Sequence, residues 1–367
     1  MQVDQFGGRD VAAANDDATA SGPSVWSGCC MIPFDFEYER AGSLTAAATL
    51  LRRRGKGARI MAGGTDLLPN MRIELVRPAA VIGLAGIVPE PPRRDENGVI
   101  RIDALSRLAT IAESAWIREH LPLLAQSVHA VGSNQIRQMG TLAGNLCQET
   151  RCLYLNQQHD YQFVSACYKR GGAVCYPFPL NKPDVCWSVY MSDVAPALIA
   201  LRAEIETING SGGRRVALED LFTGSGLVPV RLREDEIISA IIVPPTPANF
   251  GWGYHKSARR GGLEFALAIM AVTLCRDADR KTCADARIVI GAVRERPVRA
   301  LAAERVLAGA VLDEASIGKA VTAALEELRP LPHHGFSKSY IIDNVRVYLR
   351  RVLRQAARDA SGKPPAA

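Results

Sequence analysis

In residues 31–85 the pattern of apolar and polar positions is typical of a small unit that combines a helix with strands. Residues 58–61 and 81–84 are short apolar runs bounded by polar or turn residues, which is typical of buried strands. Ser43 can cap a helix that continues to Arg54, and Gly55 can end it. The pattern therefore predicts a compact helix–strand unit.

A second unit is predicted over residues 86–245. An amphipathic helix is expected at residues 108–119, and Pro122 opens another that ends near Gly132. The run APALIAL, which follows Ser192 and Asp193, predicts a further helix. The expected strands are residues 99–102, 205–208, 215–218 and 237–243, with a hairpin around NGSGG. Pro244 and Pro245 end this unit.

The third unit covers residues 250–358. Apolar runs predict strands at residues 265–275 and 286–293, and amphipathic patterns predict helices at residues 299–308, 314–328 and 337–358. A sheet followed by helices predicts an α+β domain.

Residues 1–30 have a different composition from the rest. They are small and polar and cannot bury enough apolar surface to fold, so we expect a disordered N-terminal extension. We also expect Met31 to lie close to the natural start of the folded protein.

Composition and charge narrow the class of protein. The chain has 367 residues, 48% of them apolar, and a formal net charge of +6, as expected for a globular protein of two or three domains. It contains no long uncharged apolar run and no export signal, so we expect no membrane span and a cytoplasmic location. Arginine runs such as residues 52–54 are typical of solvated helix faces, and we expect no nucleic-acid partner.

Several common catalytic motifs are missing from the sequence. It has no G-x-G-x-x-G after a strand, no P-loop, no H-E-x-x-H and no G-x-S-x-G. This excludes a simple Rossmann dehydrogenase, a P-loop NTPase, a zincin and an α/β-hydrolase. We predict no catalytic triad.

Two small-residue turns are candidates for binding a ligand. Gly63 and Gly64 directly follow the strand at residues 58–61, so consecutive backbone N–H groups can form a cradle for a diphosphate, and Thr65 adds a hydroxyl donor. An ordinary tight turn is the alternative. Residues 141–145, TLAGN, form the second such turn.

Five of the nine cysteines lie between residues 141 and 186. Four of them follow the spacing C-x14-C-x7-C-x10-C: Cys152, Cys167, Cys175 and Cys186. Four thiolates can complete the coordination of a [4Fe–4S] cluster or of a structural zinc ion. Buried thiols that act as small hydrophobes are the alternative, and the spacing alone leaves all three interpretations open.

Five motifs in this order resemble the FAD-binding medium subunit of the molybdenum hydroxylase (xanthine dehydrogenase) family. They are AGGTDLLP (62–69), QIRQMGTLAGN (135–145), SDVAPAL (192–198), LEDLFTGSG (218–226), and YHKSARR (254–260) followed by FALA (265–268). The resemblance implies an α+β protein. Its FAD-binding part, of the vanillyl-alcohol-oxidase-like kind, would have two subdomains, at residues 31–85 and 86–245. A C-terminal α+β domain of the CO-dehydrogenase flavoprotein type would follow at residues 250–358.

The resemblance also implies which residues hold FAD. These are Ile60, Met61, Ala62, Gly63, Gly64, Thr65, Asp66, Leu67, Thr141, Leu142, Ala143, Gly144, Asn145, Asp193 and Lys256. Asp193 would accept a hydrogen bond from an adenosine hydroxyl, and Lys256 would approach the flavin or its ribityl chain. The alternatives are a helix N-cap for Asp193 and an exposed lysine for Lys256. Ala143 departs from the family, which usually has glycine there, so its φ must be negative.

Residues 147–190 contain an insertion of roughly 35 residues relative to most of the family, and a loop of this length is usually functional or disordered. The insertion resembles that of the flavoprotein (beta) subunit of 4-hydroxybenzoyl-CoA reductase, which carries an extra [4Fe–4S] cluster. The ligands that this resemblance implies are Cys152, Cys167, Cys175 and Cys186, with Cys147 left over.

The function implied is that of an FAD- and [4Fe–4S]-carrying electron-transfer subunit. A molybdenum-binding large subunit and a [2Fe–2S] small subunit would complete a heterotrimer, and whether that trimer dimerises is left open. Electrons from a ferredoxin-like donor would support reductive dehydroxylation of 4-hydroxybenzoyl-CoA to benzoyl-CoA. The alternatives are the flavoprotein subunit of an aromatic, N-heterocycle or aldehyde hydroxylase with the opposite electron flow, and a zinc-binding interaction module.

Overall fold

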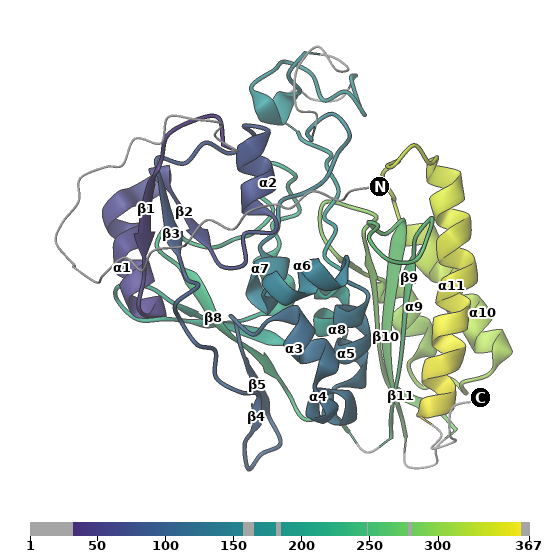
Figure 1. Ribbon diagram of the computed structural model, residues 1–367. Coiled ribbons are helices and arrows are strands. Elements are labelled where there is room, and N and C mark those ends of the chain that lie inside the picture. Colours follow the sequence, from purple (N-terminus) through teal and green to yellow (C-terminus); the bar gives the residue numbers. More distant parts are fainter. Residues whose placement is uncertain (1–31, 157–164, 181–184, 248, 278–280, 361–367) are drawn as a thin grey trace, which may run out of the picture. The chain divides into compact units, whose positions relative to one another are not determined.

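The computed structural model describes residues 32–156, 165–180, 185–247, 249–277 and 281–360, and Figure 1 shows their helices and strands. The predictions for residues 1–30 and for Met31 lie outside the described residues. No helix in the described ranges combines the length and the apolar character needed to span a bilayer.

A small parallel sheet carries the first ligand turn. Its strands are β1 (Glu37–Arg40), β2 (Ala58–Met61) and β3 (Ala80–Gly83), in the order β1-β3-β2. Helix α1 (Leu44–Arg54) packs on it and begins as predicted, because the Ser43 hydroxyl accepts a hydrogen bond from the Ala46 N–H at 3.1 Å. Short helix α2 (Leu67–Arg72) follows the glycine turn that ends β2.

The second unit contains an antiparallel sheet. Its strands are β4 (Arg93–Arg94), β5 (Ile100–Asp103), β6 (Glu204–Ile208), β7 (Arg215–Ala217) and β8 (Ile237–Val243), in the order β4-β5-β8-β6-β7. The predicted hairpin is confirmed as the antiparallel pair β6–β7. In β5, Ile100 and Ile102 are buried whereas Arg101 and Asp103 are only half-buried, which is the period of two expected for a strand with one face in the core.

Short helices accompany this sheet in the described part of the chain. They are α3 (Leu108–Glu113), α4 (Ala115–His120), α5 (Pro122–His129), α6 (Asn134–Met139), α7 (Leu142–Leu146) and α8 (Ala195–Ala200). The prediction of one helix over residues 108–119 was wrong, because the chain breaks at Ser114. This residue has extended backbone (ψ 116°), and its hydroxyl accepts from the Ile117 N–H, which caps α4.

The C-terminal unit is the predicted α+β domain. Its sheet has the order β12-β11-β10-β9, with strands β9 (Phe250–Ser257), β10 (Ala268–Arg276), β11 (Cys283–Gly291) and β12 (Val298–Arg299). Its helices are α9 (Leu301–Leu307), α10 (Glu314–Glu327) and α11 (Lys338–Asp359). Sequence patterning missed β9, in which glycines alternate with larger residues. A Cβ at Gly253 would lie 2.5 Å from the Val352 carbonyl oxygen, so glycine allows α11 to approach.

The two faces of the C-terminal sheet belong to different cores. In β10, Ile269 and Ala271 join the core around α5 and α8, whereas Met270 and Val272 join the core formed with α9, α10 and α11. The second unit and the C-terminal unit therefore share apolar contacts through the C-terminal sheet.

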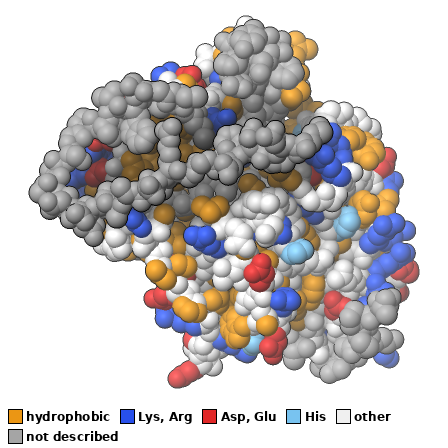
Figure 2. All heavy atoms as spheres, in the orientation of Figure 1, with side chains coloured by type: hydrophobic (Ala, Val, Ile, Leu, Met, Phe, Trp, Pro, Cys, Tyr) orange, Lys and Arg blue, Asp and Glu red, His pale blue; other side chains and the backbone are white. Residues whose placement is uncertain are grey.

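Helix α11 is amphipathic. Its arginines, including Arg346, Arg350 and Arg354, are exposed, while Val345, Leu349 and Val352 are buried against the sheet. Figure 2 shows Lys and Arg side chains gathered along the right-hand edge, where α11 lies in Figure 1. This agrees with the interpretation of the arginine runs as solvated helix faces.

Candidate functional site

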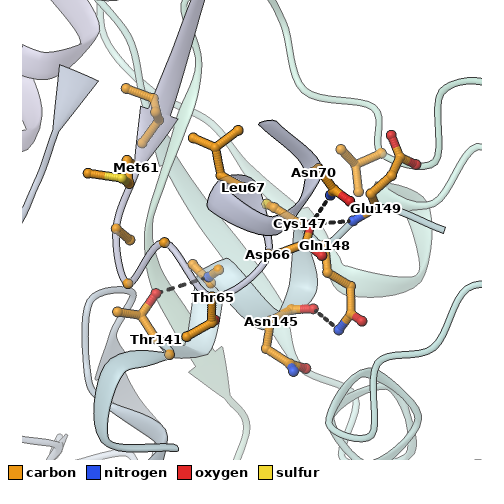
Figure 3. A pocket seen from close by; sticks show the side chains of 18 of the residues that line it. Met61, Thr65, Asp66, Leu67, Asn70, Thr141, Asn145, Cys147, Gln148 and Glu149 are labelled. Atoms are coloured by element: carbon orange, nitrogen blue, oxygen red, sulfur yellow. Dashed lines mark hydrogen bonds between the residues drawn. The ribbon is translucent and has the colours of Figure 1, made fainter. Parts of the chain in front are cut away.

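A cleft of about 820 Å³ lies where the two predicted ligand turns meet. It is lined by most of the residues predicted to hold FAD: residues 60–67, Thr141, residues 143–145 and Asp193. Leu142 and Lys256 do not line it; Leu142 is fully buried in the core. Residues from β2 and α2 thus face residues from α7, nearly 80 positions later in the chain (Figure 3).

The turn after β2 requires its two glycines. A Cβ at Gly63 would lie 1.9 Å from the Met139 carbonyl oxygen, and Gly64 has a φ of 70°. The backbone here passes so close to the end of α6 that no side chain fits. Close packing of this turn against the end of α6 therefore explains the requirement for glycine, and the diphosphate cradle stays a prediction.

The second turn begins helix α7. The Thr141 hydroxyl caps this helix by accepting a hydrogen bond from the Gly144 N–H at 3.2 Å (Figure 3). A Cβ at Gly144 would lie 2.8 Å from that hydroxyl oxygen. Ala143, where the family usually has glycine, lies inside α7 and is absent from the described residues with positive φ, so its methyl group is tolerated.

Asp66 joins the two sides of the cleft. Its carboxylate accepts hydrogen bonds from the Glu149 N–H at 2.9 Å and from the Asn70 amide at 3.3 Å (Figure 3). It also forms an ion pair with Arg151. Glu149 and Arg151 belong to the cysteine-rich insertion. The sequence gave no signal for the contacts of Asp66 with Glu149 and Arg151, because these two residues lie more than 80 positions later in the chain.

Asp193 lines the cleft, and its carboxylate is buried. Its Oδ2 lies 2.8 Å from the Lys256 ammonium, whereas its Oδ1 is buried without a partner in the described structure. Burial raises the pKa of Asp193 to about 6, against the opposing effect of Lys256. The N-cap alternative for Asp193 is wrong, since the Ser192 hydroxyl accepts from the Ala195 N–H at 3.0 Å. The exposed-lysine alternative is also wrong, since the Lys256 side chain is 10% exposed.

These observations fit a dinucleotide such as FAD. The turn after β2 offers backbone N–H groups without side chains at Gly63 and Gly64, and one buried carboxylate oxygen lacks a donor in the described structure. The N–H groups of residues 142–145 already donate within the protein. Apolar side chains that the sequence did not identify complete the lining, among them Val228, Leu263 and Phe265. Cys147 also lines the cleft, and burial raises the pKa of its thiol to about 12.

The four predicted metal ligands lie on one lobe, which we call the cysteine lobe (described residues 147–156, 165–180 and 185–190). Burial raises the pKa values of both Cys152 and Cys175, and nearby backbone groups, of Tyr154 and Leu155 for Cys152 and of Trp187 and Phe178 for Cys175, oppose this rise. Burial, with smaller contributions from the charges of Cys167 and Cys186, raises the pKa of Cys152 to about 11. All four are free thiols, and no three His, Cys, Asp or Glu side chains within the described ranges are arranged to hold a metal ion.

Comparisons with known proteins establish the family. Residues 34–246 match the family described as the FAD binding domain in molybdopterin dehydrogenase, and residues 252–356 match the CO dehydrogenase flavoprotein C-terminal domain. The fold is therefore an FAD-binding domain followed by that C-terminal domain, as predicted. The chain belongs to the family of FAD-binding medium subunits of the molybdenum hydroxylases.

Individual relatives agree with this assignment. The chain is 32% identical over 282 residues to the aldehyde oxidoreductase FAD-binding subunit PaoB of Escherichia coli (strain K12), covering 73% of this chain and 85% of that protein. It is 27% identical to the carbon monoxide dehydrogenase medium chain of Afipia carboxidovorans, covering 89% and 98%. The structure matches carbon monoxide dehydrogenase from Hydrogenophaga pseudoflava with a TM-score of 0.72 and 25% identity, covering 89% and 98%. None of these three supports the narrower resemblance to 4-hydroxybenzoyl-CoA reductase, which stays a prediction.

Proposed function

We propose that this chain is the flavin-carrying electron-transfer subunit of a molybdenum-dependent oxidoreductase. The observation that carries the proposal is the cleft that two glycine-dependent turns and the buried carboxylate of Asp193 line together. Bound FAD would supply a centre that exchanges electrons either singly or in pairs. The molybdenum cofactor and the [2Fe–2S] clusters would reside on a large and a small partner subunit, since relatives are named as medium chains or subunits of such enzymes.

Flavin content tests this proposal. The purified chain should contain about one non-covalent FAD per chain, and Gly64→Asp should abolish it, because a carboxylate would face the diphosphate and Gly64 has a φ of 70°. Gly42→Asp is the matched control, because a Cβ at Gly42 meets nothing within 4 Å. Absorbance of flavin released by heat measures the content. Full retention of FAD in Gly64→Asp would contradict the assignment of this turn.

For the cysteine lobe we propose a [4Fe–4S] cluster held by Cys152, Cys167, Cys175 and Cys186. The mutual influence of the four thiols supports it, because the charges of Cys167 and Cys186 act on both Cys152 and Cys175 and raise the pKa values of both. Metal sites of this kind commonly take their final geometry only when the metal binds. When bound, the cluster would supply a one-electron centre on the same chain as FAD.

Two alternatives for this function, a reductase and a hydroxylase, differ in the direction of electron flow through the subunit. A cluster on the cysteine lobe favours the reductase version, in which a ferredoxin-like donor supplies electrons and a partner's molybdenum site removes the phenolic hydroxyl of 4-hydroxybenzoyl-CoA. The names of the relatives favour the opposite version, since they include an aldehyde oxidoreductase and a nicotine 6-hydroxylase. Reduction of the assembled complex by a low-potential donor, compared with reduction by candidate substrates, distinguishes the two.

Serine substitutions test the ligand set. Each of Cys152→Ser, Cys167→Ser, Cys175→Ser and Cys186→Ser should remove or convert the cluster while leaving much of the FAD, because the glycine turns lie elsewhere. Cys147→Ser should keep both centres. Anaerobic purification, iron and sulfide analysis and electron paramagnetic resonance measure the outcome. Zinc in place of iron would support the zinc-binding alternative, and loss of the cluster only in Cys147→Ser would show that the ligand set is wrong.

A further inference from the structure

A chain of hydrogen bonds leads from a buried lysine of the cysteine lobe to the sulfur of Cys186. The Lys169 ammonium donates to Thr150 Oγ1 at 3.2 Å. Thr150 Oγ1 lies 2.5 Å from Ser188 Oγ, which in turn lies 3.2 Å from Cys186 Sγ. Lys169, Thr150, Ser188 and Cys186 all have side chains or residues that are less than a tenth exposed, so water competes little for these contacts.

Lys169 fixes the direction of the first bond in this chain. An ammonium has three N–H donors and no acceptor. The described structure gives the donors of Lys169 three acceptors, which are Thr150 Oγ1, Glu149 Oε1 and the Gly226 carbonyl oxygen. The Thr150 hydroxyl therefore accepts from Lys169 and keeps its own hydrogen to donate.

The nearest acceptor for the Thr150 hydroxyl is Ser188. Ser188 Oγ lies 2.5 Å from Thr150 Oγ1, whereas Glu149 Oε1 lies 3.2 Å and the Gly226 carbonyl oxygen 3.4 Å away. Glu149 Oε1 and the Gly226 carbonyl oxygen also accept from Lys169, each at 2.5 Å. Donation from Thr150 to Ser188 is therefore the favoured arrangement.

The Ser188 hydroxyl in turn has two acceptors within reach. The Gly226 carbonyl oxygen lies 3.4 Å away and is already bonded to Lys169, while Cys186 Sγ lies 3.2 Å away. A thiolate or a metal-bound sulfur carries no hydrogen and can only accept. When Cys186 is in that form, the Ser188 hydroxyl is placed to donate to it.

We propose that Thr150 and Ser188, oriented by Lys169, are positioning residues that deliver one hydrogen bond to the metal-bound sulfur of Cys186. We call these three residues the donor relay. The proposal rests on the [4Fe–4S] cluster proposed above and deepens it. Hydrogen bonds to ligand sulfurs are among the factors that set the reduction potential of an iron–sulfur cluster. A reduced cluster carries one more negative charge, so the donor relay favours the reduced form.

A purely structural role is the alternative for this network. Thr150 and Ser188 would then only satisfy each other inside the lobe, and their substitution would change stability without changing the cluster. The reduction potential separates the two roles, because a structural contact away from the sulfurs does not change it.

The experiment measures the midpoint potential of the cluster in the full chain, by anaerobic redox titration followed with electron paramagnetic resonance. In Ser188→Ala the sulfur loses its donor. We expect reduction to become about tenfold less favourable, which lowers the midpoint potential by about 59 mV for one electron. Thr150→Val should lower it by a smaller amount, because Ser188 remains but is no longer oriented. Thr150→Ser keeps the hydroxyl and should match the wild type.

Ser127→Ala is the matched control. Ser127 is also a fully buried serine, but its hydroxyl donates to the Leu124 carbonyl oxygen within α5, so the midpoint potential should not change. The double variant Thr150→Val/Ser188→Ala should have the potential of Ser188→Ala, because Thr150 acts through Ser188.

The outcomes separate the donor relay from the cluster itself. Wild-type midpoint potentials in both Ser188→Ala and Thr150→Val, with full iron content, would overturn the relay while leaving the cluster in place. If Ser188→Ala loses its iron, the comparison of Thr150→Val with Thr150→Ser decides. A wild-type chain that contains no iron would contradict the proposed cluster, and the relay with it.

Discussion

At the scale of single residues, Glu236 is a carboxylate that the fold keeps ionised. It is 4% exposed, and it accepts hydrogen bonds from Arg214 Nε at 2.6 Å, the Thr207 hydroxyl at 2.6 Å and the Arg233 N–H at 3.0 Å. Burial by itself raises the pKa of Glu236, but these donors outweigh it and lower the pKa to about 2.

This lowered pKa gives a prediction for acid stability. An ionised Glu236 stabilises the folded state fully above the ordinary pKa of 4.5, and this contribution is lost as pH falls towards about 2. We expect Glu236→Gln to lower the free energy of unfolding by about 2 kcal/mol at pH 7, with a smaller difference below pH 4.5. Urea unfolding at several pH values measures it.

Glu204→Gln is the matched control. Glu204 pairs with Arg215 between β6 and β7, but both side chains are nearly half exposed, so its loss should cost less than about 1 kcal/mol at pH 7. Equal effects of the two substitutions would contradict the argument from burial.

At the scale of elements, the cysteine lobe is bound to both sides of the cleft. Lys169 donates to Glu149 Oε1 and to the Gly226 carbonyl oxygen, both at 2.5 Å, and its side chain is 9% exposed. Arg151 pairs with Asp66 at the glycine turn. The ion pairs of the cysteine lobe therefore involve two residues that line the cleft, Glu149 and Asp66.

Removing this buried ammonium should loosen the lobe. We expect Lys169→Met to leave Glu149 without its cation and to destabilise the protein by about 3 kcal/mol. Faster proteolytic cleavage within residues 147–190 and weaker FAD binding should accompany the loss. Limited proteolysis and FAD titration measure both effects.

Lys56→Met serves as the control for this element. Lys56 also pairs with a glutamate, Glu234, but both side chains are mostly exposed, so the substitution should change neither readout. Unaltered proteolysis in Lys169→Met would show that the lobe is held by other contacts.

At the scale of the whole molecule, the C-terminal sheet completes the core of the FAD-binding part. Tyr254, Ile269 and Val289 are buried in the same core as helices α5 and α8. We predict that a chain ending at Thr246 exposes this apolar surface and aggregates, or fails to bind FAD. Size-exclusion chromatography and flavin content measure the outcome, and a soluble, FAD-binding fragment would contradict it.

Local sequence determined much of the secondary structure and the family. Ser43 caps α1, the paired glycines follow β2, and α10 and α11 lie close to their predicted ranges, because each signal depends on neighbours within a turn or two. The order of the motifs identified the family, because the motifs are spread over most of the chain and together reflect the order of its structural units. Ser114, which breaks the predicted helix, shows the limit of periodicity, since the same apolar pattern suits one long helix or two short ones.

Only the tertiary structure decided the partners of the charged side chains. Lys256 bonds to Ala130, 126 residues earlier in the chain, and Arg151 pairs with Asp66 across 85 residues. Such pairs form because packed helices and strands bring the two groups together away from water, where an unpaired charge is costly. The sequence identified Lys256 as part of a motif, but only the tertiary structure showed that it pairs with the Asp193 carboxylate.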